Sequence, residues 1–302
     1  MDLRTWTIAS RAPFFVAVIM PSLTGGAVAY YHGHFDPVLF LLVVSGMILA
    51  HAGTNYTNDY FDFRSGADIR NKNRTPFSGG SPFLPDATLK PENVLYVAMS
   101  CFALGLLIAV YLALRVGYPV VVLAGAGGFI GYFYTAPPFK FGYRGMGEFL
   151  TGLALGPLTV LGVYFVLTGS LTVEALVVSI PIGILVAAIL YVNEIPDYEA
   201  DRMAGKRHLV VILGKARAVK LVPVLFGLTY ASIVFGVVLG IMPVWTLVAL
   251  VTVPVAINIT KLAFDNYECV QKYIAAQAQT ILVHSVTGIL ISAGYLIPAF
   301  IG

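Results

Sequence analysis

Apolar stretches of roughly 20 residues follow one another along almost the entire chain, separated by short polar connections. A helix of about 20 apolar residues crosses the hydrocarbon core of a bilayer, so this pattern predicts membrane-spanning helices. We therefore expect an all-α polytopic membrane protein in which residues 1–302 form one domain around a central cavity. The nine predicted transmembrane helices are residues 11–31, 37–57, 93–114, 118–136, 146–168, 173–195, 217–240, 243–264 and 274–300.

The composition excludes an ordinary soluble globular protein. Hydrophobic residues make up 58% of the 302 positions and charged residues only 11%, with a mean hydropathy of +0.85, whereas soluble proteins carry about 25% charged residues. The first apolar segment is too long for a signal peptide and lacks a small-residue cleavage site. Cys101 and Cys269 imply no disulfide framework. Membrane lipids are expected partners, and nucleic acid is not.

The basic residues indicate the orientation in the membrane. Of the 18 Lys and Arg residues, 17 fall at the N-terminal end or in the connections after the second, fourth, sixth and eighth predicted spans, and only Arg115 falls on the other side. Lys and Arg concentrate on the cytoplasmic side of membrane proteins. We therefore expect a multi-pass protein of the cell membrane, with its N-terminus and these connections in the cytoplasm and its C-terminus outside.

Two acidic patterns, each at the end of an apolar segment, are the strongest chemical signal. The first is Asn-Asp-Tyr-Phe-Asp at residues 58–62, continuing to Asp68, and the second is Asn-Glu-Ile-Pro-Asp at residues 193–197, continuing to Asp201 and Lys206. Carboxylates this dense repel one another and cost desolvation free energy near lipid. A cation should lie between them, and Mg²⁺ is favoured because it prefers carboxylate oxygens and shares its remaining positions with phosphate.

The spacing within the patterns identifies the expected metal ligands. Asn58 and Asp62 are four residues apart, as are Asp197 and Asp201, so each pair shares one helix face. We expect Pro196 to kink or end the second helix, which weakens the single-face argument there. The predicted metal ligands are Asn58, Asp62, Asp197 and Asp201. The alternative for these polar residues is hydrogen bonding between helices.

The two acidic patterns lie a fixed distance apart. Asn58 and Asn193 are separated by 135 residues, as are Asp62 and Asp197. A repeat unit of four spans would give both copies the same orientation, which predicts a parallel internal repeat. Both acidic patterns would then face each other across the cavity at one depth. The alternative is chance matching of common residues.

Basic residues follow both acidic patterns directly. Together with a metal, such side chains neutralise phosphate oxygens, so the arrangement suits a diphosphate. The residues expected to bind it are Lys206, Arg11, Arg74 and Asn193. For the basic members, the alternative is that they set the topology and contact anionic headgroups. The connection over residues 58–91 is rich in Gly, Pro and Ser, and we expect it to be a lid that keeps water from a phosphate ester.

Aromatic residues end the fourth predicted span, where Tyr132 and Tyr134 precede a Pro pair at residues 137–138. Aromatic faces stabilise cations through their quadrupole, so either tyrosine is a candidate to shield a carbocation. The alternative is an aromatic belt at the membrane interface.

These residues resemble the UbiA superfamily of intramembrane aromatic prenyltransferases over nearly the whole chain. The pattern Asn-Asp-x-x-Asp-x(5)-Asp matches at Asn58, Asp59, Asp62 and Asp68, and the pattern Asp-x(3)-Asp-x(3)-Gly-Lys matches at Asp197, Asp201, Gly205 and Lys206. Residues 55–68, 134–138, 143–148 and 156–157 are most similar to the 1,4-dihydroxy-2-naphthoate prenyltransferases of menaquinone synthesis. That branch commonly carries Arg where this chain has Pro196.

The resemblance implies an enzyme that moves a prenyl group from a polyprenyl diphosphate to an aromatic acceptor of the naphthoate type, with Mg²⁺ assisting ionisation of the C–O bond. We place Asp59, Asp68 and Tyr134 in the catalytic centre. The two aspartates would bind metal, orient the acceptor or contact the metal ligands. One alternative is geranylgeranyl transfer to a glycerol-phosphate lipid, as in ether-lipid synthesis. Another is a secondary transporter, which is disfavoured because the carboxylates lie at span ends and not at the midplane.

Overall fold

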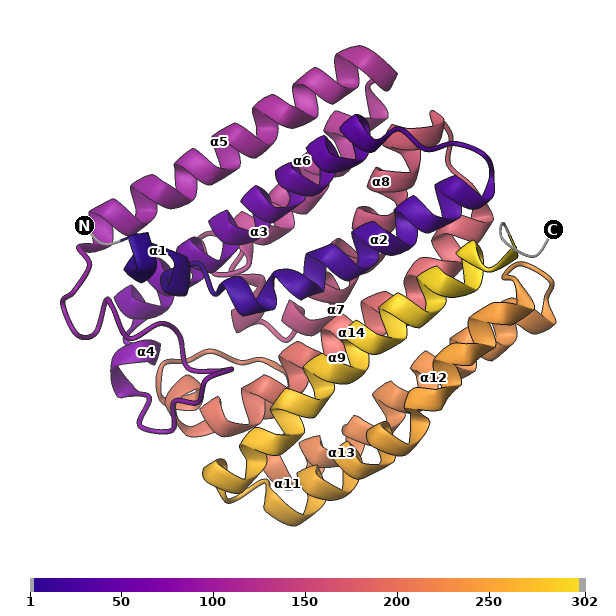
Figure 1. Cartoon of the computed structure of the whole chain (residues 1–302). Helices are drawn as coiled ribbons and strands as arrows, with labels where there is room; N and C mark the ends of the chain where they lie inside the picture. Colours follow the sequence, from indigo (N-terminus) through magenta and orange to yellow (C-terminus); the bar gives the residue numbers. More distant parts are fainter. Residues whose placement is uncertain (1–2, 299–302) are drawn as a thin grey trace.

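The computed structural model describes residues 3–298, and every regular element in that range is helical (Figure 1). The α-helices are α1 (Leu3–Ala9), α2 (Val16–Tyr31), α3 (Pro37–Ser65), α4 (Ala67–Arg70), α5 (Pro91–Val116), α6 (Pro119–Phe133), α7 (Gly147–Leu153), α8 (Thr159–Thr168), α9 (Val173–Met203), α10 (Leu209–Leu213), α11 (Lys215–Ala218), α12 (Val222–Val238), α13 (Val253–Asn266) and α14 (Val270–Leu296). The 3-10 helices are η1 (Ala12–Phe15), η2 (Phe141–Tyr143), η4 (Val219–Leu221) and η5 (Val244–Thr252), and η3 (Ala154–Leu158) is a π-helical turn. The prediction of an all-α polytopic protein is confirmed.

Eight helical segments within residues 3–298 are long and apolar enough to cross a bilayer. They correspond to eight of the nine predicted spans, and two of them extend further than expected. Helix α3 continues to Ser65 and α9 continues to Met203, so both acidic patterns are helical. The remaining predicted span, 118–136, is the shorter apolar helix α6 of 15 residues. The last predicted span, 274–300, ends outside the described residues.

Local sequence explains where the two motif-bearing helices begin and end. The side chain of Asp36 accepts hydrogen bonds from the backbone N–H groups of Val38 and Leu39 at the start of α3. Gly66 ends α3 in the left-handed region, with φ of 82°. The hydroxyl of Thr172 caps α9 by accepting from the N–H of Ala175. These caps place residues 58–62 and 193–201 in the last turns of long, rigid helices.

The expected end of the second motif helix at Pro196 is wrong. Helix α9 runs for 31 residues through both Pro181 and Pro196. A proline removes one backbone hydrogen bond but leaves those of the neighbouring turns. Residues 191–196 are buried by the surrounding helices, and this packing stabilises the helix through the proline. As a result, Asn193, Asp197 and Asp201 lie on one helix face at spacings of four residues.

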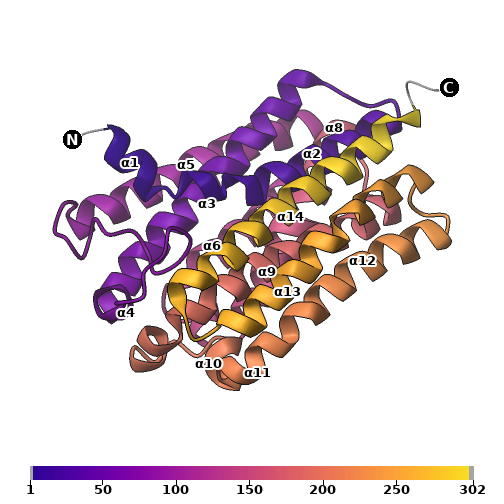
Figure 2. The ribbon, with the colours of Figure 1, turned by 60° about the horizontal axis from the view of Figure 1, so that its bottom comes forward.

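The helices pack so that the two acidic segments lie at the same end of the bundle. Helix α3 packs along α5, α9 packs along α12, and α14 contacts both α2 and α9. Gly156 lies against Gly183 of α9 so closely that a Cβ atom on Gly156 would be 2.4 Å from the Cα atom of Gly183. In Figure 2, α4 and α10 lie at one end of the bundle, and the C-terminal end of α14 lies at the other, as it also does relative to α4 in Figure 1.

Candidate active site

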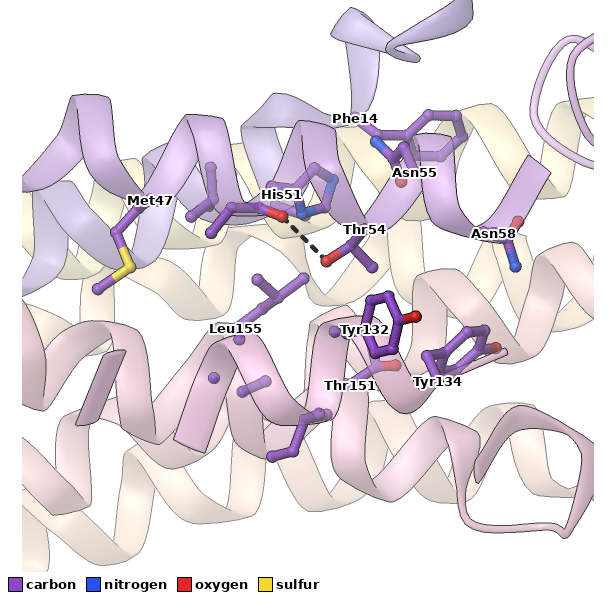
Figure 3. Close-up of a pocket in the computed structure, with 18 of the residues that line it drawn as sticks. Phe14, Met47, His51, Thr54, Asn55, Asn58, Tyr132, Tyr134, Thr151 and Leu155 are labelled. Atoms are coloured by element: carbon purple, nitrogen blue, oxygen red, sulfur yellow. Dashed lines mark hydrogen bonds between the residues drawn. The ribbon is translucent and has the colours of Figure 1, made fainter. Parts of the chain in front are cut away.

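A large cavity opens inside the half of the bundle formed by α3, α5, α6, the α7–α8 segment and α9. It has a volume of about 650 Å³. One end is polar and the other is apolar. Figure 3 shows Asn58 and Tyr134 toward one end, and Met47 toward the other. The lining residues of α3 alone run from Val43 to Asp62, a distance of about 28 Å along a helix axis.

Both acidic patterns line the polar end of this cavity, although they come from helices 135 residues apart in sequence. Five carboxylate side chains and only two cationic side chains belong to the lining. The carboxylates are those of Asp62, Asp68, Glu194, Asp197 and Asp201, and the cations are those of Arg11 and Lys206. The polar end therefore carries an excess of negative charge, which favours binding of further cations.

Lys206 links the two acidic patterns. Its Nζ lies 2.9 Å from Oδ2 of Asp62 on α3 and 3.8 Å from Oδ2 of Asp201 on α9. It also lies 5.8 Å from the centre of the Tyr143 ring. Burial disfavours the charged form of this lysine, but Asp201 and Asp62 outweigh that effect and hold the pKa of Lys206 well above its usual value. The residue is therefore a fixed positive charge at the mouth of the cavity.

Arg11 provides the second positive charge. Its Nη2 donates a hydrogen bond to Oδ1 of Asn58 at 3.1 Å and also to Oδ1 of Asp59. Arg11 lines the cavity, whereas Asp59 does not. Asp59 is 2% exposed, and its carboxylate forms an ion pair with Arg11 outside the cavity lining. This geometry gives Asp59 a positioning contact with a cavity residue, and its expected place in the catalytic centre stays a prediction.

The connection after α4 crosses the cavity mouth and reaches α9. Asn71 Nδ2 donates to Oδ1 of Asp197 at 2.7 Å, and the backbone N–H of Gly79 donates to Oδ2 of the same residue at 3.0 Å. Arg74 shapes this connection, because its side chain donates to the backbone carbonyls of Gly79 and Asp68 at 2.8 and 2.7 Å. Arg74 does not belong to the cavity lining, so its expected contact with a diphosphate stays a prediction.

Asp68 lies beneath the same connection. Its Oδ2 is buried and has no hydrogen-bond partner. Burial, together with the nearby charges of Asp62 and Asp59, raises the pKa of Asp68 well above its usual value. Gly80 packs directly on this carboxylate, since a Cβ atom there would be 2.3 Å from Oδ2. An unsatisfied buried oxygen in a negatively charged site is the expected signature of a missing cation or proton.

Two further predicted residues lie in the cavity wall. Asn193 accepts a hydrogen bond at Oδ1 from Nε2 of Gln277 on α14, at 3.1 Å. The buried ring of Tyr134 packs against Gly142 and Gly147, where added Cβ atoms would be 2.8 and 3.1 Å from ring atoms. Both residues line the cavity, but no contact in the structure tests their chemical roles.

Residue-by-residue reading of the sequence missed several polar contacts. The hydroxyl of Tyr143 donates to Oδ1 of Asp62 at 2.7 Å and fixes that carboxylate, and burial raises the pKa of Tyr143. Asn71 lies in the expected lid, but the sequence did not indicate its hydrogen bond to Asp197. Glu148 and His208 had no assigned role either. The only signal was their place in the sequence: Glu148 ends the stretch 143–148 that resembles the naphthoate branch, and His208 follows the second acidic pattern by two residues.

Comparison with known proteins identifies the family. Residues 18–281 match the UbiA prenyltransferase family. The chain belongs to this family. Family membership confirms the expected multi-pass membrane enzyme and favours it over a transporter.

Relatives of the chain include proteins named as an octaprenyltransferase and a phytyltransferase. The chain is 29% identical to the 1,4-dihydroxy-2-naphthoate octaprenyltransferase of Bacillus subtilis (strain 168), over 96% of this chain and 92% of that protein. It is 26% identical to the 2-carboxy-1,4-naphthoquinone phytyltransferase of Synechocystis sp. (strain PCC 6803), over 97% and 93%. The fold also matches a UbiA homologue from Archaeoglobus fulgidus bound to DMAPP and Mg²⁺, with a TM-score of 0.68, 15% identity, and coverage of 96% of this chain and 99% of that one.

The packing of Gly80 on Asp68 generates a prediction. Gly80→Ala should displace the connection over residues 71–90, because the added Cβ atom would collide with the Asp68 carboxylate and the backbone has a φ of 73°. We expect faster limited proteolysis within this connection. Gly169→Ala is the matched control, since Gly169 has a φ of 72° but no atom within 4 Å of an added Cβ. Equal proteolysis of both variants would contradict the packing argument.

Proposed function

We propose that this chain is an integral-membrane prenyltransferase that moves a prenyl group from a polyprenyl diphosphate to an aromatic, naphthoate-type acceptor in the menaquinone pathway. The observation that carries the proposal is the cavity with one acidic and one apolar end. A polyprenyl diphosphate has the same division, with an anionic head and a long apolar tail. Family membership independently supports prenyl transfer as the reaction class.

The donor atoms at the polar end fit Mg²⁺. Asn58, Asp62, Asp197 and Asp201 present oxygen atoms, which this hard cation prefers over nitrogen or sulfur. The excess of carboxylates over basic side chains, and the unpartnered oxygen of Asp68, are consistent with such a cation. When bound, Mg²⁺ would neutralise diphosphate oxygens and stabilise the charge that develops on the leaving group. A UbiA homologue has been solved with both DMAPP and Mg²⁺, which supports this cofactor.

The chain's own residues would position the diphosphate and stabilise its departure. Lys206 and Arg11 are partly buried positive charges that contact different members of the acidic cluster, and each forms an ion pair with a carboxylate. Asn193 lines the same end of the cavity, and we assign it to the diphosphate as well. Fixed charges aimed at a leaving group stabilise it without reorganisation during the reaction. The C1–O bond of the donor would break with its electron pair on the diphosphate oxygen. A ring carbon of the acceptor would then bond to C1 and lose its own substituent, either a proton or, from a carboxylate, CO₂.

Aromatic and water-excluding groups would protect the reacting carbon. Tyr132 and Tyr134 line the cavity beside the acidic patterns. Their faces would stabilise a positively charged allylic carbon, and burial of the site limits hydrolysis. The connection over residues 71–90 covers the polar end through its contacts with Asp197 and would act as the lid. Asp59 and Asp68 would support this centre by holding Arg11 and by accepting a cation, respectively.

The acceptor is assigned from the relatives and stays open to one alternative. Two relatives across most of the chain act on naphthoate-type or naphthoquinone-type compounds according to their names. The alternative is transfer of geranylgeranyl to a glycerol-phosphate lipid. The absence of the Arg that is common at position 196 in the naphthoate branch leaves room for this alternative, because Pro196 offers no positive charge to an acceptor carboxylate.

We also propose the full topology. Nine membrane passes fit the arrangement of helices best, because the start of α2 and the end of α14 lie at opposite ends of the bundle, and this requires an odd number of passes. Helix α6 would therefore cross as well, with the residues that follow it. The pairs α3–α5 and α9–α12 support a parallel repeat of four spans. We further propose one domain over residues 1–302, with the active-site end and the N-terminus in the cytoplasm and the C-terminus outside.

The proposed metal ligands generate the next prediction. Asp62→Ala and Asp197→Ala should each lower the rate of diphosphate release from geranylgeranyl diphosphate by at least about 100-fold, since each removes a charged group from the centre where charge develops. The measurement uses detergent-solubilised protein with Mg²⁺ and acceptor. Asp265→Ala, at an exposed carboxylate on α13, is the control and should keep wild-type activity. Activity within a few-fold of wild type in Asp62→Ala or Asp197→Ala would refute their assignment as ligands.

The apolar end of the cavity generates a prediction about chain length. Gly125 on α6 lines the cavity, and an added Cβ atom would meet nothing within 4 Å. Gly125→Leu should therefore fill the tunnel without disturbing the fold. We expect the variant to lose activity with long polyprenyl donors and to retain it with short ones. Gly227 on α12, outside the cavity, has equally open surroundings. Gly227→Leu is therefore the control and should leave activity with both long and short donors unchanged. An unchanged donor profile for Gly125→Leu would show that the tail lies elsewhere.

An acceptor screen tests the proposed reaction as a whole. The purified protein is incubated with Mg²⁺, one labelled polyprenyl diphosphate and, in parallel, naphthoates, benzoates and glycerophospholipids. We expect Mg²⁺-dependent prenylation of 1,4-dihydroxy-2-naphthoate, detected by mass spectrometry. Exclusive prenylation of the glycerol-phosphate lipid would replace the acceptor assignment but keep the reaction class. Diphosphate release with none of the acceptors would contradict both acceptor assignments.

A further inference from the structure

A second cluster of buried polar side chains begins at the cavity wall. Glu148 is in the first turn of α7, Glu194 is on α9, and His208 precedes α10. Their side chains come from three segments of the chain, and their residues are 4%, 4% and 0% exposed, respectively. One ligand atom from each lies within 4.8 Å of the others. No step of the proposed reaction uses this cluster.

Four atoms of the cluster are buried without a hydrogen-bond partner. They are both carboxylate oxygens of Glu194, Oε2 of Glu148, and Nδ1 of His208. Nδ1 of His208 lies 3.4 Å from Oε2 of Glu194, but the two are not aligned for a hydrogen bond. Within residues 3–298, neither glutamate forms an ion pair with a lysine or arginine. Two buried carboxyl groups without such partners must either hold a proton or meet another positive group.

The other oxygen of Glu148 and the other ring nitrogen of His208 form hydrogen bonds, and these bonds orient the two side chains. Oε1 of Glu148 accepts from the backbone N–H of Leu209 at 2.7 Å. Nε2 of His208 forms a hydrogen bond with Oδ2 of Asp201 at 3.0 Å. A metal-binding histidine typically donates its second ring N–H to a carboxylate, which leaves the first nitrogen free to bind. His208 has this arrangement, with Nδ1 directed at the two glutamates.

We propose that Glu148, Glu194 and His208 bind a second divalent metal ion, of the Zn²⁺ class and distinct from Mg²⁺. One imidazole nitrogen with two carboxylate groups is a donor set that suits zinc, whereas magnesium rarely accepts imidazole. The three ligand atoms would move closer together on binding. The inference does not depend on the reaction proposed above, because its ligands are different residues.

The cluster borders two cavities. Glu194 also lines the large cavity, and Glu148 lines a small apolar cavity of about 200 Å³ with Leu209 and Tyr191. A metal site needs a path by which the ion enters, and the large cavity provides it. The lining of the small cavity is mostly apolar, which keeps the surroundings of Glu148 apolar.

The position of the cluster assigns the metal a structural role. It joins α7, α9 and residues 204–208, the segment that carries Lys206. His208 in turn contacts Asp201, which lies 3.8 Å from Lys206. A metal bound to His208 would fix the orientation of the Asp201 side chain through their hydrogen bond, and it would fix the backbone at Lys206, two residues earlier in the chain. Glu148, Glu194 and His208 are therefore proposed as positioning residues, not catalytic ones.

Metal content tests the proposal directly. The full chain is purified in detergent, stripped with a chelator, and equilibrated with micromolar Zn²⁺ in the presence of excess Mg²⁺. We expect about one zinc per chain by inductively coupled plasma mass spectrometry, and X-ray absorption at the zinc edge should show nitrogen and oxygen ligands without sulfur. His208→Gln and Glu194→Gln should each lose the bound zinc.

Two controls locate the ion. Asp62→Asn with Asp197→Asn removes charge from the proposed magnesium site and should leave the zinc content unchanged. His284→Gln changes another fully buried histidine without hydrogen-bond partners, on α14, and should also keep the zinc. Absence of bound zinc in the wild-type protein would overturn the proposal and favour a proton shared by the two glutamates. Retention of zinc in both cluster variants would overturn it as well.

Discussion

The fold depends on one electrostatic constraint: five carboxylates line one end of a cavity inside an apolar bundle, with only two basic side chains among them. Charge of one sign is costly to bury, and the protein limits this cost by giving three of the carboxylates, those of Asp62, Asp197 and Asp201, specific hydrogen-bond donors. The carboxylate of Asp62 accepts hydrogen bonds from Tyr143, Asn58 and Lys206. The carboxylate of Asp197 accepts hydrogen bonds from Asn71 and from the backbone N–H of Gly79. The residual negative charge then remains available to attract cations and the diphosphate that accompanies them.

The long helices make this arrangement possible. Helices α3 and α9 extend past the apolar part of the bundle, so their last turns carry polar residues to the mouth of the cavity. The apolar remainder of α3, with α5 and α6, forms the wall that a prenyl tail requires. Glycines on α6 leave this wall without side chains at several positions, which widens the cavity. The same helices thus provide both halves of an amphipathic site.

The sequence predicted those parts of the structure that depend on local patterns. Apolar stretches identified eight long helices, and the four-residue spacing of Asn58 and Asp62 identified a shared face that turns into the cavity. Contacts between distant segments were not predictable. Nothing near Arg74 indicates that it binds the carbonyls of Asp68 and Gly79, and nothing near His208 indicates Asp201, Glu194 and Glu148 as neighbours. The continuity of α9 through Pro196 also depends on tertiary burial, which outweighs the local preference of proline.

The two hydrogen bonds between the connection over residues 71–90 and Asp197 have a thermodynamic consequence. The connection and any ion or ligand at this end of the cavity act on the same carboxylate. If contact of the connection with Asp197 changes the binding free energy of the ion or ligand, binding of that ion or ligand must change the free energy of the contact by the same amount, because such coupling is reciprocal. Closure over the polar end and occupancy of that end are therefore linked quantities, and a change in a residue of the connection that never touches the substrate would still alter how tightly the substrate is held.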